Sequence, residues 1–187
     1  MKLKLIKMKS VKSTNDTAIR LIKKNQFKPT LITSATQKKG RGTMGKKWVS
    51  IKGNLFISVF FEINSKKINF KQFAILNAYL IRKIISRYTS EKIDIKWPND
   101  LLIKKHKVCG ILQEIIDYKE KKFLIVGAGI NTNYSPNILN FKATSLRNMS
   151  KKNIDSKKVL KDVKKVYEKF IYEISKYNFL YLKKKLK

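Results

Sequence analysis

The sequence predicts an α+β domain whose sheet is mixed, largely antiparallel and flanked by helices. Short alternating or continuous apolar runs separated by turns are typical of strands, and two long stretches with apolar residues three and four apart predict amphipathic helices. The 187 residues suffice for one well-packed core, and no internal repeat or linker-like change in composition interrupts them. We therefore expect residues 1–187 to form a single domain.

The first third of the chain is expected to hold three strands and one short helix. Met1–Lys7 alternates charged and apolar residues, which is typical of a strand and unlike the continuous apolar core of a secretory signal. Ser13–Asp16 is a run of residues that cap helix N-termini, so a short helix is predicted to begin there. Leu31–Ala35 is a brief β-type run, and Leu55–Phe61 is apolar enough for a buried strand.

The rest of the chain is expected to hold two long helices with strands between them. The clearest helix covers Phe70–Tyr88, and a second is predicted from Val159 to Ile174, continuing through Leu180. Residues 131–140, with Pro136 and four asparagines, are expected to be a loop. Four runs are predicted to be strands: Ile93–Trp97 before Pro98, Leu101–Ile103, Val108–Ile116, and Phe123–Val126 ending in Gly127-Ala128-Gly129. Leu101–Ile103 and Val108–Ile116 are expected to form a hairpin around the polar turn 104–107.

The formal net charge of +32 suggests a nucleic-acid-binding protein at first sight. Only five of the 44 basic residues are arginines, however, whereas readout of base edges relies heavily on arginine. The lysines are also spread along the whole chain, and abundant Lys, Asn and Ile is what an AT-rich genome would encode. We therefore interpret the charge mainly as a solvated surface that attracts acidic partners in a salt-dependent way, and keep a basic nucleic-acid-binding module as an alternative.

The sequence also narrows the compartment and the chemistry. It contains no run of about 18 apolar residues, so we expect no membrane span. Cys109 is the single cysteine and excludes an internal disulfide, and with one histidine no zinc constellation is available. These features fit a protein of the reducing cytoplasm.

The glycine-rich stretch Gly40–Trp48 is the most informative part of the sequence. Its three glycines allow positive φ angles and close approach to a ligand, and Arg41, Lys46 and Lys47 would attract an anion. The aromatic Trp48 closes the segment. This combination favours a phosphate-bearing ligand over a plain surface turn.

Other polar segments end strands or lie in turns: Ser13-Thr14-Asn15, Lys96-Trp97-Pro98-Asn99-Asp100, Lys107, and Gly127–Asn131. Each has a structural explanation of its own. The first is a helix cap, the second a turn that ends a strand, and Lys107 is one lysine among many. Gly127-Ala128-Gly129 serves close strand packing, because the third glycine and the following helix of a dinucleotide-binding fingerprint are absent.

Taken together, these segments resemble the catalytic domain of biotin–protein ligases, also called biotin–[acetyl-CoA-carboxylase] ligases, in order and spacing. The resemblance covers about residues 10–147, and Lys96–Asp100 is its most specific element. It is carried by Ser13-Thr14-Asn15, Gln37 with Gly40-Arg41-Gly42 through Trp48, Lys96–Asp100, Lys107–Leu112 and Val126–Asn131. It implies a fold like that of class II aminoacyl-tRNA synthetases and biotin ligases.

The resemblance further implies that the chain activates biotin with ATP and transfers it to a lysine of the biotin carboxyl carrier protein of acetyl-CoA carboxylase. Arg41 and Lys107 would be the catalytic cations. The biotin site would comprise Ser13, Thr14, Asn15, Gln37, Gly40, Arg41, Gly42, Trp48, Lys107 and Gly110. The adenylate site would comprise Arg41, Lys96, Asn99, Asp100, Lys107 and Asn131, with Asn131 recognising adenine and Asp100 near the Mg²⁺ that accompanies ATP.

Elementary chemistry agrees with these assignments. A carboxylate that attacks the α-phosphate of ATP brings two anions together, and cations such as Arg41 and Lys107 offset their repulsion. Magnesium would be held mainly by the phosphates and one carboxylate, so no metal cage is expected from the sequence. A neutral lysine amine then attacks the mixed anhydride, from which adenylate is a good leaving group, so positioning of the two reactants is expected to do most of the work. No covalent enzyme nucleophile is needed, and Cys109 is expected to be a small strand residue.

The sequence departs from the family in three respects. Thr43 stands where many relatives carry a second arginine, as Gly-Arg-Gly-Arg, so we expect the loop to retain the adenylate less tightly. Only about ten residues precede the matching region, so we expect no DNA-binding helix-turn-helix domain and a monofunctional ligase. The small C-terminal β-barrel domain of relatives is also expected to be absent.

Three alternatives remain open from the sequence. A lipoate or octanoate ligase of the same fold has a similar acyl pocket, although Lys96–Asp100 favours biotin. A basic nucleic-acid-binding module would lose its binding at moderate salt. An inactive relative that only binds biotin is disfavoured by the presence of Arg41 and Lys107. We expect no specific DNA binding and no membrane association, and exposed sheet edges make a homodimer plausible.

Overall fold

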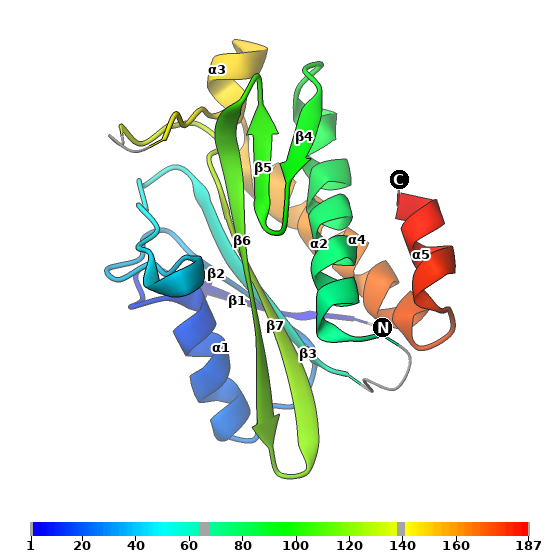
Figure 1. Ribbon diagram of the computed structural model, residues 1–187. Coiled ribbons are helices and arrows are strands. Elements are labelled where there is room, and N and C mark those ends of the chain that lie inside the picture. Colours follow the sequence, from blue (N-terminus) through cyan, green and yellow to red (C-terminus); the bar gives the residue numbers. More distant parts are fainter. Residues whose placement is uncertain (1, 64–67, 138–140, 187) are drawn as a thin grey trace.

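The computed structural model describes residues 2–63, 68–137 and 141–186. Within them, seven strands form one sheet in the order β1-β2-β3-β7-β6-β5-β4 (Figure 1). Only β1 and β2 pair in parallel, and the other neighbours are antiparallel, which confirms the mixed sheet. The strands are β1 (Lys4–Met8), β2 (Thr30–Ser34), β3 (Leu55–Glu62), β4 (Ile93–Lys96), β5 (Asp100–Ile103), β6 (His106–Tyr118) and β7 (Lys121–Ile130).

Helices cover both faces of this sheet (Figure 1). The helix α1 packs on one face, and α2 and α4 pack on the other, with α5 against α2. The α-helices are α1 (Thr14–Lys23), α2 (Phe70–Ile85), α3 (Leu146–Ser150), α4 (Ser156–Ile174) and α5 (Phe179–Leu186), and short 3₁₀ turns lie at Thr43–Gly45 and Ser86–Tyr88.

The central strand β3 shows how the sequence specifies this layered arrangement. Its side chains alternate, so that Val59 and Phe61 enter the core below α2 and α4, while Phe60 enters the smaller core below α1. Because both faces are covered, residues 55–61 are all buried, and Ser58 is the one polar residue among them, in agreement with the buried strand predicted over Leu55–Phe61.

The predicted helix starts are confirmed by their capping contacts. The Ser13 hydroxyl accepts a hydrogen bond from Asp16 N at the start of α1. Asn69 and Gln72 form a capping box at the start of α2. The helix predicted over Phe70–Tyr88 ends one turn early, and its last residues form the 3₁₀ turn Ser86–Tyr88.

Two sequence-based expectations about element ends are wrong. The strand predicted over Phe123–Val126 and ending in Gly127-Ala128-Gly129 forms part of β7, which starts earlier, at Lys121, and continues to Ile130. The helix predicted to continue through Leu180 ends at Ile174, and a new helix α5 begins at Phe179. Asn178 explains the second difference, because its side-chain oxygen accepts a hydrogen bond from Tyr181 N and so starts a separate helix.

Some expectations fall only partly on the described residues. Residues 131–137 form neither helix nor strand, as predicted, whereas 138–140 and Met1 lie outside the described residues. The short helix α3 has no counterpart among the predicted elements. In the described part of the chain, no helix is both long and apolar enough to cross a lipid bilayer.

Candidate functional site

One cavity brings together the polar segments that the sequence singles out. It is lined by the start of α1, the glycine-rich loop, the turn before β5, and the adjoining parts of β6 and β7. Of the predicted site residues, the following line it: Ser13, Thr14, Asn15, Gln37, Arg41, Gly42, Trp48, Asn99, Lys107, Gly110 and Asn131. The other three do not line it: Gly40 is buried, Lys96 is exposed on β4, and Asp100 contacts the lining residue Lys107.

The glycines of β6 and β7 are explained by two side chains that lie directly on these strands. A Cβ atom on Gly129 would lie 2.3 Å from Trp48 Cε2, and one on Gly110 would lie 2.5 Å from Trp48 Cζ3. A Cβ atom on Gly127 would lie 2.2 Å from Asn15 Oδ1. The glycines therefore allow Trp48 and Asn15 to pack against the strand backbone at the floor of the cavity.

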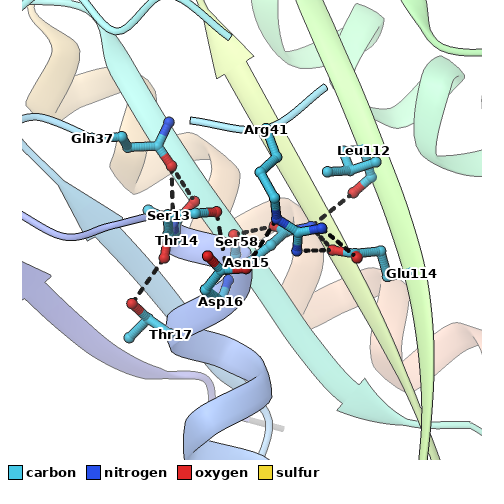
Figure 2. Close-up of polar contacts among 10 residues, drawn as sticks. All are labelled: Ser13, Thr14, Asn15, Asp16, Thr17, Gln37, Arg41, Ser58, Leu112 and Glu114. Carbon is cyan, nitrogen blue, oxygen red and sulfur yellow. Dashed lines mark hydrogen bonds and ion pairs between the residues drawn. The ribbon is translucent and has the colours of Figure 1, made fainter. Parts of the chain in front are cut away.

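The start of α1 is held in place by a network of buried polar contacts. Gln37 Oε1 accepts hydrogen bonds from Thr14 N at 2.9 Å and from the Thr14 hydroxyl at 3.1 Å (Figure 2). Gln37 Nε2 donates to Ser50 Oγ. Asn15 Oδ1 accepts from the Ser58 hydroxyl, and Asn15 itself is 2 % exposed. These amides therefore position the wall of the cavity as well as lining it.

Arg41 is engaged by two carboxylates on different elements. Its Nη1 and Nη2 donate to Glu114 Oε1 and Oε2 of β6 at 2.9 and 2.8 Å, in a bidentate arrangement (Figure 2). Its Nε lies 2.9 Å from Asp16 Oδ1 of α1. Burial alone would lower the pKa of Arg41, but the hydrogen bonds and charges of Glu114 and Asp16 outweigh it and raise that pKa. Arg41 is thus a fixed cation at the wall of the cavity.

Lys107 is the second cation of the cavity and has a different environment. Its Nζ lies 2.7 Å from Asp100 Oδ1, and both side chains are about four-fifths buried. The same ammonium lies 5.4 Å from the ring centre of Trp48 and 5.3 Å from that of Phe141. Both distances allow cation–π attraction. Lys107 is therefore held between two aromatic rings beside one carboxylate.

The sequence-based site prediction lacks three residues of this arrangement: Asp16, Glu114 and Phe141. Glu114 follows the matched segment Lys107–Leu112 by two positions and is recognisable only once β6 is folded beside α1. Phe141 lies in the loop before α3, and only the tertiary structure brings it to Lys107. In the sequence, Phe141 is recognisable only as an aromatic residue directly after the predicted loop 131–140.

The tip of the glycine-rich loop is connected to the Pro-Asn-Asp turn. Asn99 Nδ2 donates to Thr43 Oγ1 at 3.3 Å. The next residue, Met44, has φ 54° and is 94 % exposed, and Gly45 has φ 72°. Two successive residues in the left-handed region make the tight reversal of the loop, at a conformational cost for Met44.

Asn131 lies at the end of β7 and is 1 % exposed. Its Nδ2 donates to Thr144 O at 3.0 Å, and its Oδ1 accepts from Asn54 Nδ2 at 3.4 Å. Its side chain thus ties β7 to the segment that follows Phe141. Recognition of adenine by Asn131 stays a prediction.

The structure predicts that Cys109 is chemically inert in the folded protein. The side chain is fully buried on β6, and burial raises the pKa of its thiol far above the ordinary value. We expect iodoacetamide to leave Cys109 unmodified in the native protein and to modify it rapidly in denaturant. Intact-mass measurements compare the two states, and rapid labelling of the native protein would contradict this expectation.

The fold and the cavity define a class of protein: a mixed sheet on which a glycine-rich loop and the cations Arg41 and Lys107 border one cavity. The chain belongs to the biotin/lipoate A/B protein ligase family, whose sequence pattern it matches over residues 8–131. Similar characterised proteins and solved structures agree with this assignment.

The bifunctional ligase/repressor BirA of Bacillus spizizenii is 33 % identical over 171 residues, which cover 88 % of this chain and 53 % of that protein. The biotin protein ligase of Aquifex aeolicus, solved in complex with biotin and ATP, is similar with a TM-score of 0.81 and 33 % identity. That match covers 98 % of this chain and 76 % of the Aquifex chain. The chain spans about half the length of the curated BirA relatives from Bacillus. The expected likeness to biotin-ligase catalytic domains is confirmed.

Proposed function

We propose that this chain activates biotin with ATP to biotinyl-5′-AMP and transfers the biotinyl group to a lysine of a biotin carboxyl carrier protein. The observation that carries the proposal is the convergence of Arg41, Trp48 and Lys107 on one cavity. The likeness to an Aquifex aeolicus ligase that binds biotin and ATP supports the same substrates here. The reducing cytoplasm is the compartment we propose, because the one cysteine is a free thiol.

In the first half-reaction, a carboxylate oxygen of biotin attacks the α-phosphorus of ATP and pyrophosphate leaves. Negative charge gathers on the phosphorus oxygens in the transition state, so cations held nearby lower the barrier. Lys107 is suited to this role because it lies in a largely buried site, where charge interactions are weakly screened. Arg41 would hold the biotin end, close to Asn15 and Gln37.

Magnesium fits this site as a companion of the nucleotide. Among the described residues, no group of three or more His, Cys, Asp or Glu side chains could hold a metal ion. Asp100 is the carboxylate beside Lys107, and Asn99 supplies an amide oxygen at the same turn. These two residues would supplement phosphate oxygens around Mg²⁺, which would neutralise phosphate charge when bound.

In the second half-reaction, the neutral amine of the carrier lysine attacks the carbonyl carbon of the mixed anhydride. The carbon–oxygen bond to AMP breaks, AMP leaves, and the amine proton passes to solvent. AMP is a good leaving group, so alignment of the two substrates accounts for most of the expected rate enhancement. The net charge of +32 would speed encounter with an acidic carrier domain.

ATP-dependent biotinylation of a purified carrier domain tests the proposal directly. Labelling should require ATP and biotin and should vanish when the acceptor lysine of the carrier is replaced by arginine. Exchange of labelled pyrophosphate into ATP, measured with biotin and separately with lipoate, tests the acyl substrate. Exchange that depends on lipoate and not on biotin would reject the biotin assignment in favour of the lipoate one.

The substitution Thr43→Arg is expected to slow the escape of the adenylate. Thr43 lies at the loop tip beside Asn99, where an added guanidinium could hydrogen-bond the phosphate of a bound adenylate. We expect the off-rate to fall on the order of tenfold, the effect of one charge-assisted hydrogen bond. The off-rate is measured by following the release of labelled adenylate from the protein over time.

Thr43→Val is the matched control, since it removes the hydroxyl that accepts from Asn99 without adding charge. Its off-rate should stay equal to or exceed that of the unmodified chain. Equal off-rates for Thr43→Arg and the unmodified chain would refute the idea that this loop retains its intermediate less tightly.

A further inference from the structure

Glu114 is the residue through which three separate elements meet at the cavity. Its carboxylate, on β6, accepts two hydrogen bonds from Arg41 of the glycine-rich loop. The same carboxylate accepts a third from Asn15 Nδ2 of α1, at 2.6 Å (Figure 2). Glu114 is thereby joined to Arg41, which lies 73 positions away in the sequence, and to Asn15, which lies 99 positions away.

The contacts require a carboxylate at this position. Every partner of the two Glu114 oxygens is a donor: Nη1 and Nη2 of Arg41, and Nδ2 of Asn15. An ionised carboxylate offers only acceptors, whereas glutamine would turn an NH₂ group toward one of these donors. The bidentate geometry also fixes the plane of the guanidinium, which a single acceptor would not do.

Asp16 completes the arrangement from the other side. It holds the Nε edge of Arg41 at 2.9 Å, so the two carboxylates together use three of the five N–H donors of the guanidinium. The remaining two donors belong to a side chain that lines the cavity. The glycine-rich loop is thus fastened to β6 and α1 while part of Arg41 stays available to a ligand.

We propose that Glu114 is a positioning residue that fixes Arg41 and Asn15 before substrate binds, and that Asp16 is its partner in this role. The glycine-rich loop is then ordered in the ligand-free protein. Biotin binding does not have to bear the full entropic cost of ordering the loop. The kinetic part of this inference rests on the proposed function, whereas the ordering of the loop does not.

Limited digestion with trypsin tests loop order without any substrate. The loop carries trypsin sites at Lys39, Arg41, Lys46 and Lys47, and mass spectrometry identifies cleavage at each of them. We expect Glu114→Gln to accelerate cleavage there on the order of tenfold, as expected when charged hydrogen bonds that hold a segment are lost. Asp16→Asn should give a smaller acceleration, because it removes one contact of Arg41 instead of two.

Glu62→Gln is the matched control. Glu62 lies on β3 of the same sheet and pairs with Lys121 at 2.7 Å, outside the cavity, and its replacement changes the net charge equally. Loop cleavage in this variant should match that of the unmodified chain. Equal acceleration in the control, or no acceleration in Glu114→Gln and Asp16→Asn, would overturn the positioning role.

Kinetics of pyrophosphate exchange separate positioning from chemistry. Glu114→Gln should raise the KM for biotin on the order of tenfold and lower kcat far less than Arg41→Ala does, because Arg41 keeps its charge and its contact with Asp16. A fall in kcat at unchanged KM would overturn the proposal, because Glu114 would then act in the chemical step. If the unmodified chain shows no biotin-dependent exchange, the proposed function fails, while the digestion result still decides the ordering of the loop.

Discussion

The Lys107→Ala variant is expected to form adenylate on the order of 10²–10³-fold more slowly than the unmodified chain, the usual effect of losing one charged group that stabilises a transition state. The Lys107 ammonium is the largely buried cation beside Asp100, and Trp48 and Phe141 limit its movement. Its removal leaves Asp100 to repel the phosphates. The biotin-dependent exchange of pyrophosphate measures the loss, and circular dichroism checks that the fold persists.

Lys158→Ala is the matched control for this experiment. Lys158 is exposed on α4 and does not line the cavity, and its replacement removes the same unit charge. The control should exchange at the native rate. Near-native exchange by Lys107→Ala would refute its assignment as a catalytic cation, whereas an equal loss in both variants would point to the overall charge of the surface.

The Arg41→Ala variant is expected to lose adenylate formation to a similar degree, on the order of 10²-fold or more. Two effects act in the same direction. The cavity loses a cation, and the carboxylates of Glu114 and Asp16 are left facing each other without a counterion. Arg41→Lys should recover only part of the activity, because an ammonium cannot make the bidentate contact with Glu114 and reach Asp16 together.

Arg20→Ala provides the control for Arg41. Arg20 is exposed near the end of α1, so its removal tests loss of an arginine from the same helix that carries Asp16. We expect native exchange from this variant. Full activity of Arg41→Lys would show that charge alone suffices, and full activity of Arg41→Ala would remove Arg41 from the catalytic assignment.

Much of the fold can be predicted from local patterns. The pattern of apolar residues predicts which side chains are buried, because side chains repeat with a period of two in strands and of 3.6 in helices. Examples are the alternation in β1, the largely apolar run of β3 and the spacing of three and four in α2. The ends of elements are harder to predict. Asn178 lies within the helix predicted to continue through Leu180, and its capping role is evident only once its contact with Tyr181 is known.

The candidate site was predictable to a lesser extent. Gln37, Arg41 and Lys107 can be identified from their order and spacing in the chain. Their partners cannot. Glu114 is one acidic residue on a strand, and its contacts with Arg41 and Asn15 join segments that no local pattern relates.

The sequence by itself determined the type of chain: an α+β domain with the ordered set of segments that marks the biotin/lipoate ligase family. These properties are encoded in periodicity, in capping residues and in short motifs, which act over a few neighbouring residues. Only the tertiary structure decided which charges meet. Arg41 forms ion pairs with Glu114 and Asp16, and Lys107 forms one with Asp100. These pairs form because strand pairing and helix packing bring distant carboxylates within hydrogen-bonding distance.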